Sequence, residues 1–206
     1  MSATSGPVRL RTGIAVGAVA GIAWSAALRA YMSAIAGSES TVSWLGTFVG
    51  ILLPGMLVGA ALGASTCLDP AMHRGRVALR WCAASVLLLA VVPMLLPNQL
   101  VALLTSGLGG GAIAIGVGGL AGGYALAGRR VWLRVVCAPV AALIIVGIPA
   151  SVPTVGGDAL SPTTPRGVWV MLLAGSLMIV LIAAAAIPFR RLNEAPGAAE
   201  SRLTRR

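Results

Sequence analysis

Long apolar blocks, separated by short connections that carry the arginines, constrain the fold of this chain more than any other feature. Six such blocks cover residues 13–36, 42–65, 77–97, 107–128, 131–150 and 167–189. A helix needs about 20 mostly apolar residues to cross the ~30 Å hydrocarbon core of a membrane. Charged residues make up only 10% of the chain, whereas a soluble domain carries about 25%. The sequence therefore predicts an all-α integral membrane bundle of six transmembrane helices, preceded by a short segment at 1–12 and followed by a basic tail at 190–206.

The arginines predict the orientation of this bundle. All 15 Lys and Arg residues of the chain are arginines. With six crossings, all but Arg29 and Arg166 lie on one side of the membrane: Arg9, Arg11, Arg74, Arg76, Arg80, Arg129, Arg130, Arg134, Arg190, Arg191, Arg202, Arg205 and Arg206. Basic residues are retained on the cytoplasmic side, so we expect both termini in the cytoplasm and the tail without regular structure. Aromatic residues favour both interfaces, and they fall at the inner ends (Trp81, Tyr124, Trp132, Phe189) and at the outer ends (Tyr31, Trp44, Trp169).

Glycines four residues apart give the first two blocks a face of small residues. They are Gly13, Gly17 and Gly21 in the first block and Gly55, Gly59 and Gly63 in the second. In lipid, small residues at this spacing let two helix backbones approach closely. We therefore expect this hairpin to be the seam against which the other helices pack. Pro54 removes a hydrogen bond to the carbonyl of Gly50, which predicts a kink in the second helix.

The first block has two interpretations. A charged start followed by an apolar stretch is typical of a signal peptide, and Ala34-Ile35-Ala36 resembles a cleavage site. However, the apolar stretch exceeds the 7–15 residues of a signal core, and Arg29 interrupts the approach to that site. The sequence favours an uncleaved first helix.

This sequence contains no set of residues that could act together in catalysis. Gly63-Ala64-Ser65-Thr66 is similar to the GxSx motif of rhomboid-type intramembrane proteases, but the one histidine, His73, falls in a connection expected in the cytoplasm. A serine nucleophile needs a base within about 3 Å. No Asp or Glu falls within a block, although proton-coupled transporters place carboxylates at membrane depth. We expect a protein that is not an enzyme, with no catalytic residues, no cofactor and no metal.

The net charge of +10 predicts a partner as well as an orientation. Nucleic-acid binders gather basic and aromatic residues on one face, whereas these arginines flank apolar blocks. The expected partner is therefore a lipid bilayer with anionic headgroups, and nucleic acid is excluded.

Arg29 is the one charge expected within a crossing. It could dock an anionic headgroup or substrate, or it could extend to the outer surface near Glu39 or Asp158. The second interpretation is favoured, because a charge deep in the bilayer costs about 2.5–3.5 kcal/mol and a charge near the interface costs little.

The first hairpin resembles a group of small actinobacterial integral membrane proteins that are described only as conserved membrane proteins. The matching residues are Gly21-Ile22-Ala23-Trp24, Arg29, Tyr31-Met32 and Ser43-Trp44-Leu45-Gly46-Thr47. Ser33 and Thr41-Val42 stand where the group has a second arginine and an acidic-aromatic pair. The resemblance implies a multi-pass protein of the bacterial plasma membrane with no assigned activity. It also implies a cluster of Arg29, Trp24 and Trp44 in the outer leaflet.

Two functions remain open. The first is a non-enzymatic component of the bacterial cell envelope, which packs against a membrane-protein partner, a second copy of itself or envelope lipids. The alternative is a small permease or channel for a neutral or lipid-like solute, with helices broken at Pro54, Pro93 and Pro139. A water-lined cavity at mid-depth, near Pro54 and the glycine-rich block 107–128, would favour the alternative, and a dry, closed bundle would exclude it.

Overall fold

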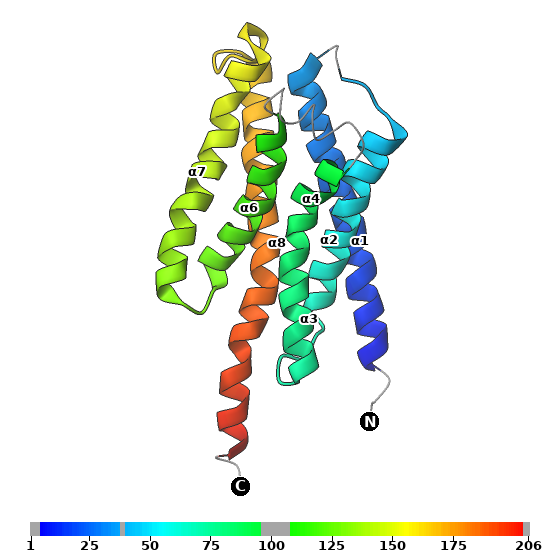
Figure 1. Ribbon diagram of the computed structural model, residues 1–206, viewed down its shortest axis with the longest axis vertical. Coiled ribbons are helices and arrows are strands. Elements are labelled where there is room, and N and C mark those ends of the chain that lie inside the picture. The colour runs from blue at the N-terminus through cyan, green and yellow to red at the C-terminus, as the bar shows by residue number, and fades with distance from the viewer. Residues whose placement is uncertain (1–4, 38–39, 96–107, 204–206) are drawn as a thin grey trace.

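The predicted all-α fold is confirmed by a computed structural model, which describes residues 5–37, 40–95 and 108–203. Long helices run side by side along one axis, with the start of the first helix and the end of the last at the same end of the bundle (Figure 1). Five helical stretches are long and apolar enough to cross a membrane: Val8–Ala36, Trp44–Ser65, His73–Leu95, Val131–Gly156 and Pro165–Glu194. Gly111–Ala127 is a shorter apolar helix.

The helices follow one another in the order that the apolar blocks predict. The first half contains α1 (Ser5–Ala36), the π-helix η2 (Trp44–Leu52), α2 (Leu53–Ser65), α3 (His73–Ala84), the 3-10 turn η3 (Ser85–Leu87) and α4 (Leu88–Leu95). The second half contains α6 (Leu108–Ala127), α7 (Val131–Gly156), the 3-10 turn η4 (Asp158–Leu160) and α8 (Pro165–Leu203). The interfacial helix considered for 98–106 lies outside the described residues.

Pro54 lies where the second crossing changes its hydrogen bonding. The π-helix η2 is capped by Ser43, whose Oγ accepts a hydrogen bond of 3.0 Å from the Gly46 N–H. The N–H of Leu53 still donates to the carbonyl of Phe48, five residues back. Pro54 then occupies the first turn of α2, where a missing N–H costs least. The proline that was expected to kink the helix thus marks the boundary between a π-helical and an α-helical segment.

Three helices extend beyond the apolar blocks. α1 begins at Ser5, and α7 continues past Ala150 to Gly156, where Gly157 ends it with a φ of +64° that favours glycine. α8 continues to Leu203, although the sequence analysis expected a tail without regular structure from Arg190. Alanines, which have the highest helix propensity, and an ion pair between Arg191 and Glu194, three residues apart, support this extension.

The central helix of the bundle is α8, rather than the hairpin that the glycines suggested. It packs against α1, α2, α3, α6 and α7. Its buried residues recur every three or four positions and join two apolar clusters: Val170, Ala174 and Leu177 with Tyr31 and Val152, then Leu181 and Ala185 with Val58, Leu62, Val86 and Leu89. The hairpin cannot take this central place, because its glycines are used in packing its own two helices together.

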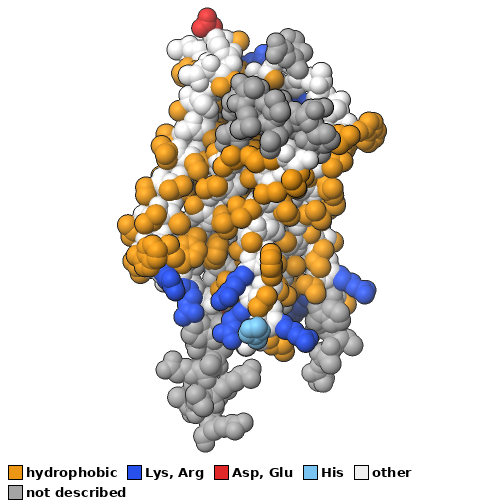
Figure 2. All heavy atoms as spheres, viewed as in Figure 1, with side chains coloured by type: hydrophobic (Ala, Val, Ile, Leu, Met, Phe, Trp, Pro, Cys, Tyr) orange, Lys and Arg blue, Asp and Glu red, His pale blue; other side chains and the backbone are white. Residues whose placement is uncertain are grey.

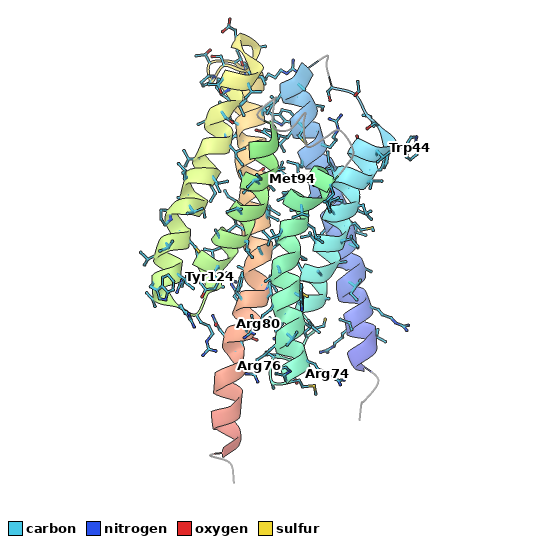
Figure 3. The ribbon with its side chains drawn as sticks, in the orientation of Figure 1. Trp44, Arg74, Arg76, Arg80, Met94 and Tyr124 are labelled. Atoms are coloured by element: carbon cyan, nitrogen blue, oxygen red, sulfur yellow. The ribbon has the colours of Figure 1, made fainter. Side chains whose placement is uncertain are left out.

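Most of the arginines of the described residues gather at one end of the bundle. Figure 2 shows a broad apolar band with most of the arginine side chains below it, and an acidic side chain with a few basic ones at the other end. Arg74, Arg76 and Arg80 project from α3 at the former end, whereas Trp44 projects at the opposite end (Figure 3). We call the former the arginine end; it contains the starts of α1 and α3 and the turn between α6 and α7.

Candidate functional site

A cavity of about 900 Å³ lies between α1 and α2 on one side and α8 on the other. It is lined by one face of α1 from Val8 to Trp24, one face of α2 and its C-terminal end from Gly55 to Cys67, and one face of α8 from Val180 to Arg191. Leu89 of α4 contributes to the lining as well. We call this cavity the hairpin groove. Most of its wall is glycine, alanine, valine and leucine, which makes its length apolar.

The glycines predicted for helix packing bring α1 and α2 into contact along one wall of the groove. They form three facing pairs across α1 and α2: Gly13 with Gly63, Gly17 with Gly59 and Gly21 with Gly55. A Cβ added to Gly13 would lie 2.9 Å from the carbonyl oxygen of Gly63, and a Cβ on Gly17 or Gly21 would overlap the facing backbone. The two backbones therefore touch, as small residues in lipid allow. These six glycines also line the groove, so its wall on the hairpin side is largely backbone.

Trp24 lines the end of the groove that is farther from the arginines. Its indole Nε1 donates a hydrogen bond of 2.9 Å to the main-chain carbonyl oxygen of Leu177 on α8. The ring also packs against both apolar clusters of the core. A buried indole N–H needs such a partner, so Trp24 ties α1 to α8 at this end of the cavity.

Two arginines line the other end of the groove. Arg9 lies in the first turns of α1, and Arg191 lies on α8. Arg191 Nη1 donates to Glu194 Oε2 at 2.8 Å, and Nη2 donates to the carbonyl oxygen of Leu68 at 3.2 Å. The Nε of Arg191 is buried and has no hydrogen-bond partner. Within the described residues, the Arg191–Glu194 contact is the one ion pair closer than 4.0 Å.

Arg29, Trp24 and Trp44, which the resemblance implied to form one cluster, each make contacts of their own in the structure. Arg29 Nη2 donates to the carbonyl oxygen of Thr41 at 2.7 Å, and its Nε lies 3.5 Å from Thr47 Oγ1. Trp44 stacks on Phe48 with ring centroids 4.7 Å apart and is 79% exposed. Trp24 faces α8 instead. Arg29 thus connects α1 to the segment before α2. Glu39, one of the two acidic residues expected near Arg29, lies outside the described residues.

Ser65 of the protease-like motif and His73, the one histidine, have different surroundings in the structure. Ser65 is buried, and its Oγ donates to the carbonyl oxygen of Leu62 at 2.6 Å, one turn back in α2. His73 is exposed at the start of α3. In the part of the chain that the structure describes, no three His, Cys, Asp or Glu side chains gather in a way that could hold a metal ion. The hairpin groove is therefore the candidate site that the geometry offers.

Sequence reasoning missed the contribution of α8 to this site. Arg191 was counted only among the arginines that orient the chain, and its neighbour Arg190, which does not line the groove, carries the same signal. The glycine spacing on α1 and α2 does point to one wall of the groove. No match was found to any model of a protein family, any curated protein or any solved structure.

Proposed function

We propose that this protein crosses the bacterial plasma membrane six times, with both termini in the cytoplasm, and binds a lipid-like amphiphile in the hairpin groove without catalysing a reaction. The observation that carries the proposal is the groove itself: about 900 Å³ of mostly apolar space with arginines at one end only. Ligand sites in proteins commonly have volumes of about 300–1,000 Å³ and apolar walls with a few placed polar groups.

The distribution of charge supports the proposed topology. Arginines gather at the arginine end of the bundle, as the retention of basic residues in the cytoplasm predicts. α6 has 20 residues, so its length of about 30 Å matches the ~30 Å hydrocarbon core. Six crossings return the end of α8 to the side on which α1 begins.

The groove favours the second of the two functions that the sequence left open. A component that acted only by packing would need no internal space between α1, α2 and α8. The groove reaches mid-depth and includes Gly55, the residue next to Pro54, as a transport site would require. It differs from the expected cavity in its second wall, which is α8 instead of the glycine-rich α6, and in its lining, which is mostly apolar where a water-lined cavity was expected. The apolar lining fits a lipid-like solute better than a hydrophilic one.

The proposal is tested by filling the groove. Ala20 lines the groove on α1, whereas Ala15 is also exposed on α1 but lies outside it. The full chain and its Ala20→Trp and Ala15→Trp variants are purified in mild detergent, and bound amphiphiles are measured by native mass spectrometry. We expect bound lipid on the parent chain and on Ala15→Trp, and loss of that lipid on Ala20→Trp. Equal lipid on all three chains would contradict the proposal.

A further inference from the structure

We propose further that the amphiphile is an anionic phospholipid, with its phosphate between Arg9 and Arg191 and its acyl chain along the glycine seam. This inference rests on the proposed function and names its ligand. Three features of the groove carry it: the charges at its open end, its dimensions, and the end of the bundle at which it opens.

The charges at the open end match a phosphate. Arg9 and Arg191 both line the groove, and no Asp or Glu occurs among its described lining residues. Glu194 neutralises part of the Arg191 charge through Nη1, but the Nε of the same guanidinium is buried without a partner. Arginine binds phosphate through several N–H donors at once. The Arg191 side chain is 32% exposed, so a phosphate in the groove would pair with the charges of Arg191 and Arg9.

The carbonyl of Leu68 prepares Arg191 for this role. It accepts from Nη2 at 3.2 Å, and Glu194 accepts from Nη1 at 2.8 Å. The guanidinium is therefore held between α8 and the end of α2 before a ligand arrives. A donor that is already oriented loses little freedom on binding.

The length of the groove fits a hydrocarbon chain. Arg9 and Trp24 are 15 residues apart on α1, a distance of about 22 Å along the helix axis. One leaflet of the hydrocarbon core is only ~15 Å deep, so the groove accommodates the full length of an acyl chain.

The groove opens at the same end of the bundle as the other arginines. Its mouth therefore lies at the depth where lipid phosphates of that leaflet are found, and its apolar length extends into the hydrocarbon region. Val16 and Val180, which line the two sides, are both exposed. A lipid of that leaflet could thus enter sideways, with its headgroup remaining at the interface throughout.

The test compares phosphatidylglycerol with phosphatidylcholine carrying the same acyl chains. The full chain is purified in detergent with each lipid, and retained lipid is measured by native mass spectrometry. Arg9→Gln and Arg191→Gln remove the proposed phosphate contacts. Arg11→Gln and Arg190→Gln remove the same charge at the same helix ends, but these two residues do not line the groove. Thermal unfolding of each variant shows whether it is folded.

We expect the parent chain to retain phosphatidylglycerol about tenfold better than phosphatidylcholine, since a charge-assisted contact of this kind changes affinity by about that factor. Arg9→Gln and Arg191→Gln should lose this preference, and Arg11→Gln and Arg190→Gln should keep it. If Arg191→Gln does not fold, because its bond to Leu68 is lost, Arg9→Gln decides the matter alone.

The inference is overturned if the two lipids bind equally, or if all four arginine variants weaken phosphatidylglycerol to the same extent. In that case, displacement of both lipids by Ala20→Trp would leave the proposed function standing with a different ligand. If Ala20→Trp displaces neither lipid, the proposed function and this inference fall together.

Discussion

Trp24 on α1 and Leu177 on α8 are 153 positions apart in sequence, and the indole Nε1 of Trp24 donates to the Leu177 carbonyl oxygen at 2.9 Å. This bond joins the glycine hairpin to the central helix at the end of the hairpin groove that is farther from the arginines. Leu177 belongs to the cluster of Tyr31, Val152 and Val170, and Trp24 packs against the same cluster. The bond therefore fixes the separation of α1 and α8 where the core is dense, while the helices are free to diverge toward Arg9 and Arg191.

Removing this bond should destabilise the bundle modestly. Trp24→Phe keeps an aromatic ring at the position but cannot donate to Leu177. Hydrogen bonds between membrane helices contribute about 0.6 kcal/mol on average and at most about 1.7 kcal/mol. We expect the free energy of unfolding in detergent to fall by that amount, measured by denaturant titration. Trp44→Phe is the matched control, because Trp44 is 79% exposed and should leave the midpoint unchanged.

The glycine pairs should be far less tolerant of added volume than other helical glycines. A Cβ on Gly17 would overlap the backbone of Gly59, whereas a Cβ on Gly147 meets no atom within 4 Å. Overpacking of this kind typically costs about 1–3 kcal/mol. Gly17→Ala should therefore lower the free energy of unfolding by about that amount.

Gly147→Ala should be neutral or slightly stabilising, because alanine has the higher helix propensity and the position is open. Both variants add one methyl group to a long helix, so the comparison isolates the close approach of α1 and α2. Equal thermal midpoints for the two variants would contradict the seam that the structure shows.

Periodicity and charge predict much of this fold, but they do not predict which helix lies at the centre of the bundle. The apolar blocks indicate the order of the helices, because a crossing must satisfy its backbone internally, but α1, α7 and α8 extend well beyond their blocks. The blocks do not show which helix is central. Leu172 and Leu177 are the same residue type on the same helix, yet the first is 69% exposed and the second 7%. In lipid, apolar side chains face acyl chains and protein alike, so no alternation marks the buried face.

The sequence predicts the candidate site less completely than it predicts the fold. Glycine spacing points to the α1–α2 wall of the groove, but Arg190 and Arg191 are adjacent and identical, and only Arg191 lines the cavity. Its role depends on the rotation of α8 and on contacts with Leu68 and Glu194. The first of these contacts joins residues 123 positions apart, which no local pattern can indicate.

Arg29 should stabilise the segment from Thr41 to Thr47 through its hydrogen bonds. Its guanidinium donates to the Thr41 carbonyl oxygen at 2.7 Å and reaches toward Thr47 Oγ1. Arg29→Ala removes both contacts, so the segment from Thr41 to Thr47 should open more often. Hydrogen exchange of the amides in that segment should become several-fold faster, as local opening costs about 1 kcal/mol less.

Arg166→Ala is the control for this experiment. Arg166 also lies outside the arginine end, at the start of α8, and is exposed. Its removal should leave exchange in the segment from Thr41 to Thr47 unchanged. If Arg29→Ala also leaves exchange there unchanged while lipid binding falls, Arg29 would be a docking group after all.

The native cysteines allow a direct test of the proposed topology. Cys67 is exposed at the arginine end, and its Sγ donates a weak hydrogen bond to the carbonyl oxygen of Arg9 at 3.4 Å. With Cys82→Ala and Cys137→Ala in the background, Cys67 is the one remaining thiol. A membrane-impermeant maleimide should modify it in inverted membrane vesicles but not in intact cells.

Thr163→Cys, in the connection before α8, should show the reverse pattern once Cys67→Ala is added. Labelling of Cys67 in intact cells would place the arginine end outside, against the retention of basic residues in the cytoplasm, and would also move the proposed phosphate site to the other leaflet.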